Sequence, residues 1–101
     1  MSKLNQMAGL YAPFAYESVT VTNTSTTLTA STYLNASRAF MTVETAAVRY
    51  RVDGAAPTSA EGHLLNIGDV LTLIGLQTIR NFKAIRTGAT SGVLKVTYEE
   101  N

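Results

Sequence analysis

The sequence contains no cysteine and no tryptophan. Without cysteine, the chain can form no disulfide and offers no thiolate as a metal ligand or nucleophile. Its 101 residues are nonetheless enough for one domain, because a chain of this size buries roughly 65% of its extended-chain surface on folding. We therefore expect one hydrophobic core that needs no cross-links. The lack of cysteine is compatible with a reducing cytosol.

Long apolar runs and an excess of charge of either sign are also missing. No stretch approaches a membrane span of about 18 apolar residues, and no apolar run follows Lys3 as in a signal peptide. The net charge is +1, from 8 basic and 7 acidic residues, whereas a duplex-binding domain carries a clear basic excess. We therefore expect no membrane and no nucleic acid as partner. Charged residues make up only 15% of the chain, so its surface is poorly defended against association.

Side chains suited to catalysis or metal binding are sparse. His63 is the only histidine; beside Gly62 we expect it in a loop, and we interpret it as a surface residue because no second ligand or nucleophile accompanies it. Asp53 and Asp69 each stand next to a glycine and are explained by turn chemistry. A calcium site would need more oxygen ligands than these two turns offer. The sequence predicts a protein that is not an enzyme and uses no cofactor and no metal.

Short segments of alternating polarity predict β-strands from Glu17 onward. In the clearest of them, Val48, Tyr50 and Val52 share one face, and Arg49 and Arg51 share the other. The same reasoning predicts strands at 18–22, 26–29, 38–44, 47–52, 70–74, 81–86 and 93–98. We expect 38–44 to be buried on both faces, 70–74 to be a core strand, and 30–37 to be a loop.

The strand pattern predicts an all-β fold. A helix could be read over 69–80, but Gly75 and the Val, Leu, Thr and Ile content argue against it. Seven or eight short strands separated by turns are typical of a β-sandwich, of jelly-roll or immunoglobulin-like type. Its core should include Val48, Tyr50, Val52, Leu71, Leu73, Phe82, Leu94, Val96 and Tyr98.

Residues 1–16 differ from the sandwich domain predicted over 17–101. This segment has no helical or strand period, and Pro13 interrupts any strand pairing. Large apolar side chains are costly to leave in water, so we predict an extended N-terminal arm that docks on its own domain or on a neighbour. The side chains that would make this contact are Leu4, Met7, Leu10, Tyr11 and Phe14.

Four basic residues form a second candidate contact surface. Arg49, Arg51, Lys83 and Lys95 lie on three predicted strands and would form a positive stripe if those strands were neighbours. Such a stripe is either a solvated outer face or a contact surface for an acidic protein. DNA binding is less favoured, because Tyr50 and Tyr98 point away from the basic positions.

Residues 48–99 resemble the C-terminal half of small bacteriophage virion proteins. The segments that carry this resemblance are VRYRVDGAAPTSAEGHLLNIGDVLTLIG and IRNFKAIRTGATSGVLKVTYE. Some members of that group are capsid decoration (cement) or head-associated proteins. The resembling positions are mostly turn and core residues, so they favour a shared fold more than a shared role. They cover about half of the chain.

The resemblance implies a structural virion protein, made in the host cytoplasm, that binds the outside of the head and stabilises it. Its partner would be the major capsid protein or another virion protein, and it would self-associate, with a trimer favoured. One alternative is a tail, neck or head-fibre component. Another is a carbohydrate-binding sandwich module, which the lack of tryptophan disfavours; Tyr33 is the one loop aromatic in the predicted domain.

Overall fold

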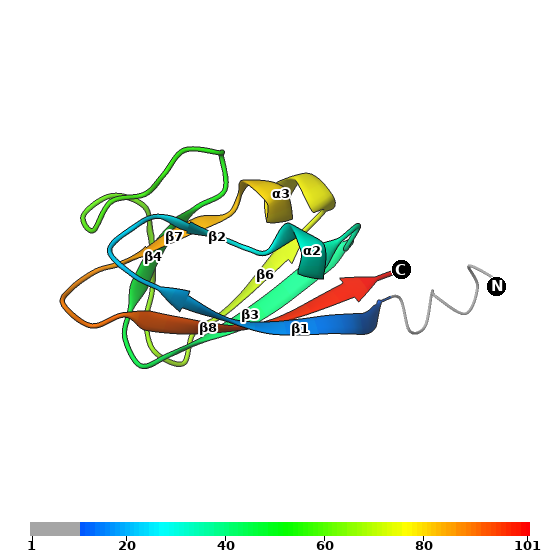
Figure 1. The fold of residues 1–101 in the computed structure, drawn as a ribbon, viewed down its shortest axis with the longest axis horizontal. Helices are drawn as coiled ribbons and strands as arrows, with labels where there is room; N and C mark the ends of the chain where they lie inside the picture. Colours follow the sequence, from blue (N-terminus) through cyan, green and yellow to red (C-terminus); the bar gives the residue numbers. More distant parts are fainter. Residues whose placement is uncertain (1–10) are drawn as a thin grey trace.

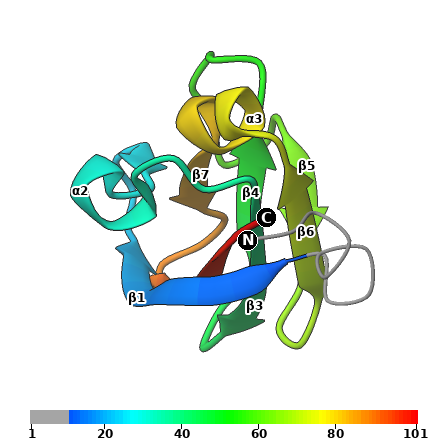
Figure 2. The same cartoon turned by 90° about the vertical axis from the view of Figure 1, so that its right-hand side faces the viewer.

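The computed structural model of the chain describes residues 11–101, which form two antiparallel sheets that pack face to face (Figures 1 and 2). Sheet A has the strand order β1-β8-β3-β6, and sheet B has the order β2-β7-β4-β5. The predicted all-β sandwich is therefore confirmed. The strands of sheet A are β1 (Ala12–Val21), β3 (Arg38–Glu44), β6 (Val70–Ile74) and β8 (Gly92–Glu100). Those of sheet B are β2 (Thr26–Thr27), β4 (Val48–Arg51), β5 (His63–Leu65) and β7 (Lys83–Arg86).

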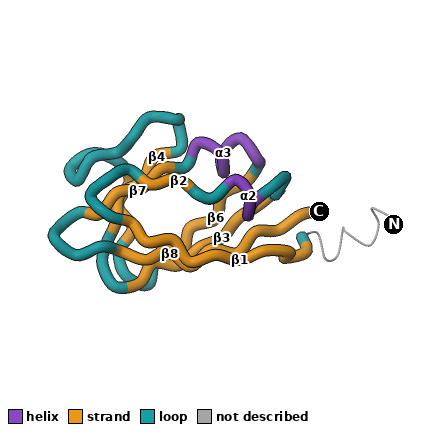
Figure 3. Tube along the Cα trace, in the orientation of Figure 1, coloured by secondary structure: helices purple, strands orange, loops and turns teal. Residues whose placement is uncertain are grey.

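Two short helices, α2 (Ala30–Tyr33) and α3 (Leu76–Asn81), lie at the same end of the sandwich (Figure 3). Neither was expected from the sequence. The predicted loop 30–37 contains α2, a four-residue turn of helix. Gly75, with a φ of 92°, ends β6 and lets the chain turn into α3. The glycine that argued against a long helix is thus the residue that starts a short one.

The core between the sheets is built by alternate residues of the strands. In β8, Leu94, Val96 and Tyr98 are fully buried, and the residues between them are only half-buried. Of the predicted core, Val48, Leu73 and Phe82 are also buried. Tyr50, Val52 and Leu71 are partly buried and pack against the core. Met41, Val43 and Ile79 are further core residues that the sequence did not single out.

Strands β3 and β6 correct two expectations. The segment 38–44 is buried on one face only, because sheet A is covered by sheet B on one side and Phe40 points to the other. The segment 70–74 is an edge strand, and Leu73 is its one fully buried residue. Both errors have one cause. Some apolar side chains of these two strands lie on the outer side of sheet A, so each strand has the sequence expected of a strand that is buried on both faces.

The first strand begins five residues before the expected start of the domain. Ala12 pairs with Glu100, and the pairing with β8 continues to Val21 and Gly92. Pro13 interrupts the ladder as expected, since the register shifts between Pro13 and Ala15. The strand persists because β1 is an edge strand, where a missing N–H is tolerated. Residues 12–16 therefore belong to the sheet, and an arm can comprise only the residues before them.

Candidate functional site

The outer face of sheet A, which points away from sheet B, carries exposed apolar side chains. Cross-strand pairing aligns Tyr16, Thr97, Phe40 and Thr72 in one row across all four strands. Tyr16 is 59% exposed and Phe40 is 38% exposed. The neighbouring rows end in Val70 and Ile74 on β6, and both of these side chains are also exposed. The result is a threonine-rich face that carries one aromatic side chain on the edge strand β1 and another on the central strand β3.

An ion pair bounds this outer face at one end. Arg38 Nε lies 2.6 Å from Glu99 Oε1, and the two residues are opposite each other on β3 and β8. The hydrogen bond to Glu99 raises the pKa of Arg38. The ring of Tyr11 covers the guanidinium, with 4.1 Å between Arg38 Cζ and the ring centroid, a distance at which a cation and an aromatic ring attract each other. The chain therefore enters sheet A across its outer face.

The predicted arm residues fall into two groups. Leu4, Met7 and Leu10 lie outside the described residues. Tyr11 contacts Arg38, and Phe14 packs against the core of its own domain. Within the described part of the chain, both aromatic residues thus contact the chain's own sandwich.

The predicted basic stripe is only partly formed. Arg51 pairs directly with Lys83, and Arg49 lies two residues along the same face of sheet B. Lys95 is in β8 of sheet A, so it does not join them; its Nζ donates to Ser18 Oγ at 3.1 Å. The stripe therefore has three members. Lys95 was wrongly included because the alternation of side chains along a strand does not reveal which strands are neighbours in a sheet.

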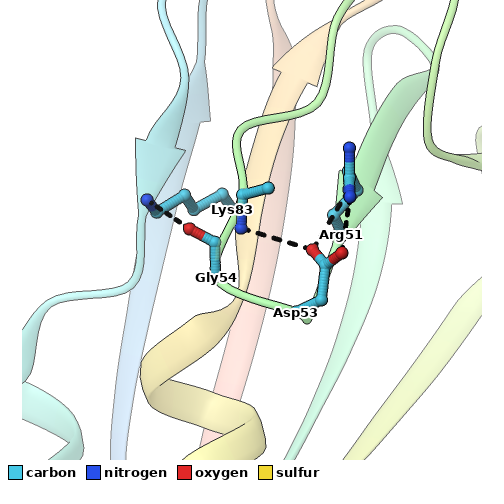
Figure 4. Close-up of polar contacts among 5 residues, drawn as sticks. Arg51, Asp53, Gly54 and Lys83 are labelled. Carbon is cyan, nitrogen blue, oxygen red and sulfur yellow. Dashed lines mark hydrogen bonds and ion pairs between the residues drawn. The ribbon is translucent and has the colours of Figure 1, made fainter.

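The three remaining basic side chains hold the loop 52–62, which connects β4 to β5. Arg49 donates to the carbonyl oxygens of Ser59 and Gly62. Figure 4 shows Lys83 donating to the Gly54 carbonyl oxygen at 2.9 Å, and Arg51 paired with the Asp53 carboxylate. These contacts give the basic residues an internal structural role instead of a free positive surface.

Two open hollows adjoin this loop. One hollow has a volume of about 480 Å³. It is lined by residues of this loop, of the turn between β1 and β2, and of the end of β7, including Asn23, Ser59 and Arg86. The other, of about 380 Å³, is lined by Arg51, Asp53, Glu61, Gly62 and His63. The Arg51 guanidinium holds the pKa of Asp53 below its usual value. Asp53 is thus ionised at neutral pH, and its carboxylate is already paired with the Arg51 guanidinium.

Several sequence-based expectations concern absences. Over residues 11–101, no group of three or more His, Asp or Glu side chains is arranged to hold a metal ion. No helix in the same part of the chain is long and apolar enough to cross a membrane. Tyr33, expected as the one loop aromatic of the predicted domain, is half-buried in α2, and its ring centroid lies 6.0 Å from that of Tyr98. Tyr33 therefore packs against the core.

Comparisons with known proteins identify no relative. No protein-family model matches the sequence, and no curated protein and no solved structure shows significant similarity to this chain. The candidate site thus rests on geometry alone: the outer face of sheet A is a threonine-rich surface with exposed apolar side chains on a paired sheet.

Proposed function

We propose that this chain is a non-enzymatic assembly protein that attaches to a larger protein surface through the outer face of sheet A. The observation that carries the proposal is that Tyr16 and Phe40 are exposed in one row of a four-stranded sheet, on either side of Thr97. Exposed aromatic side chains on a flat, weakly charged surface favour protein contact. The sheet supplies stiffness, because both of its central strands are paired on two sides.

In its specific form, the proposal is a decoration protein on a bacteriophage head. The support for this form is the resemblance of residues 48–99 to small virion proteins, together with the contact surface described above. Decoration requires only a rigid scaffold and a complementary patch, because the free energy of binding opposes expansion of the shell. The major capsid protein is the proposed partner, and attachment at a tail or neck is the alternative.

If the proposal holds, a phage encodes this chain, and the experiment is co-sedimentation of the purified chain with heads of that phage. The variant carries Tyr16→Ser together with Phe40→Ser. Burying what is exposed of two rings is worth about 1.5–3 kcal/mol, so binding should weaken at least tenfold. The matched control is Leu34→Ser, since Leu34 is also 59% exposed but lies beyond α2, off the outer face.

Three outcomes decide the proposal. Loss of binding in the double variant, with binding retained in the control, supports it. Equal binding by the double variant and the wild type excludes the outer face as the attachment surface. Failure of the wild-type chain to bind heads, with binding to tails or necks instead, excludes the decoration role and favours the alternative.

A further inference from the structure

The edges of the two sheets differ in how they are protected against pairing with another chain. A sheet edge exposes unpaired N–H and C=O groups, and proteins blunt it with short strands, proline, bulges or inward-pointing charges. In sheet B the edge strands β2 and β5 have only two and three residues. In sheet A, β1 carries Pro13, a register shift and the partly buried carboxylate of Glu17.

The fourth edge, β6, has none of these devices. Its sequence VLTLI contains no charge, no proline and no glycine, and it pairs regularly with β3 over all five residues. Within residues 11–101, no strand pairs with its other side. Val70 is 63% exposed and Ile74 is 58% exposed. An apolar, regular edge with which no described strand pairs is a template for strand addition.

The hydrogen bonds that flank β6 show which of its backbone groups face outward. Gly75 N–H donates to Ser37 O, and Val43 N–H donates to Asp69 O. These bonds place the odd-numbered residues of β6 in hydrogen-bonded pairs with β3, since such pairs alternate along an antiparallel ladder. The N–H and C=O groups of Val70, Thr72 and Ile74 therefore point to the open edge.

The sequence of β6 complements itself. When two β6 strands run antiparallel with Thr72 opposite Thr72, Val70 lies opposite Ile74 on the outer face, and Leu71 lies opposite Leu73 on the core face. Every apolar side chain then meets an apolar side chain, and threonine meets threonine, a favourable cross-strand pair. The outward backbone groups of Val70, Thr72 and Ile74 face their counterparts in this register, so each pair exchanges two hydrogen bonds.

We propose that β6 pairs with β6 of a second copy, centred on Thr72, so that sheet A continues across a two-fold axis. Within residues 11–101, most of the exposed large apolar residues outside this strand are its neighbours in sequence or in the sheet: Leu64 and Ile67 precede it, and Phe40 lies beside it on β3. A five-residue edge spans about 17 Å, which is short for a standard interface. We therefore expect a dimer that forms with increasing concentration.

The proposal goes beyond attachment to a larger particle, because it concerns the edge of sheet A and a copy of the same chain. The resemblance to virion proteins implies a trimer, whereas a self-complementary strand closes under two-fold symmetry. The oligomer number therefore separates the two ideas, and it can be measured without any other protein.

The experiment is sedimentation equilibrium of the full chain from about 10 μM to 1 mM, the range in which such contacts associate. Val70→Lys and Ile74→Glu are each expected to weaken dimerisation at least tenfold, because a charge then faces an apolar side chain of the second copy. Circular dichroism of each variant shows that it remains folded. The decisive sample is an equimolar mixture of the two variants.

In that mixture, the proposed register places the Val70→Lys side chain of one copy opposite the Ile74→Glu side chain of the other. The opposite charges attract each other, and the second pair of the interface keeps its native Val70 and Ile74. The mixture should therefore form a heterodimer that neither variant forms alone. A Thr72→Pro chain supplies a further control: it should remain folded, because this N–H does not serve β3, and should be monomeric.

Four results would overturn the proposal: a wild-type chain that is monomeric at 1 mM, a trimer, single variants that still dimerise, or a mixture that stays monomeric. A wild-type chain that dimerises only after residues 2–10 are deleted would also overturn it, since the N-terminal segment would then occupy the edge. Binding to phage heads is measured separately, so either proposal can fail while the other holds.

Discussion

Tyr98 Oη donates a hydrogen bond of 2.5 Å to Glu17 Oε2, which joins β8 to β1 at the margin of the core. Tyr98 is fully buried. The same carboxylate accepts hydrogen bonds from the N–H and Oγ1 of Thr29, which precedes α2. Glu17 thus ties the helix at the end of the sandwich to sheet A. Burial raises the pKa of Tyr98 well above its usual value, and the hydrogen bond to Glu17 raises it further.

The first prediction concerns alkaline pH. Because the folded-state pKa of Tyr98 is raised, its stabilising contribution is complete below the unfolded-state pKa of about 10 and is lost as the pH rises above that value. Tyr98→Phe should lower the free energy of unfolding at pH 7 by about 1.5–3 kcal/mol, the worth of a hydrogen bond to a charged group. The variant should also lose less stability than the wild type between pH 9 and 11. Urea unfolding at both pH values checks this, and equal losses in the two chains would contradict it.

The second prediction compares two glycines. A Cβ on Gly92 would lie 2.6 Å from both Ala46 O and Val48 Cγ1, so one backbone atom and one buried side chain would have to move. We expect Gly92→Ala to lower the free energy of unfolding by about 1–3 kcal/mol, as overpacking does. Gly88→Ala is the control, because nothing lies within 4 Å of its added Cβ. Chemical denaturation of both variants tests the difference; similar losses would rule out the close contact at Gly92.

The third prediction tests the core face of β6. Leu73 is 3% exposed, and Leu73→Ala should cost about 2–5 kcal/mol of unfolding free energy. Leu34→Ala removes the same atoms from an exposed position and should change stability by less than about 0.5 kcal/mol. Both are measured by urea unfolding at a concentration at which the chain is monomeric. A loss of less than 0.5 kcal/mol for Leu73→Ala would mean that β6 does not cover the core.

The fourth prediction concerns the loop over sheet B. Asp53 Oδ1 accepts hydrogen bonds from Arg51 Nε and from the Ala55 N–H, and its pKa is lowered chiefly by the contact with Arg51. Its contribution is therefore present above the unfolded-state pKa of about 3.9 and is lost as the pH falls through the lower folded-state value. The amide proton of Ala55, followed by NMR, should titrate below pH 3.9 and should not titrate in Asp53→Asn. A midpoint above that pH would contradict the ion pair.

The strands were predictable because alternation is a local property of the sequence. In β4, the alternation of Val48 and Tyr50 with Arg49 and Arg51 correctly predicts the inward and outward faces. In β8, the apolar positions Leu94 and Val96 do the same. The short helices were missed for the opposite reason. Residues 76–81 form fewer than two turns, which is too short for a helical period to show.

The candidate site was much less accessible to sequence reasoning. Phe40 was assigned to a strand buried on both faces, and only the position of β3 in a two-layer fold shows that one face is open. Lys95 was grouped with Arg49 and Arg51 because pairing between distant strands leaves no local signal. The lack of charged residues in 70–74 was the one available clue in the sequence to this surface. That lack is equally compatible with a core strand and with an unprotected edge strand.

The pairing of β1 with β8 also has a kinetic consequence. Ala12 meets Glu100, and β8 lies between β1 and β3. The pairing of β3 with β6 can form without β8, but β1 has no native partner in the sheet until the last strand inserts between β1 and β3. Contacts between segments so far apart in sequence must overcome a large loop-closure entropy before any pairing stabilises them. We therefore expect sheet A to form late and slowly, on the millisecond-to-second scale of β-sandwiches. A chain that ends before β8 would leave β1 and β3 without the strand that lies between them.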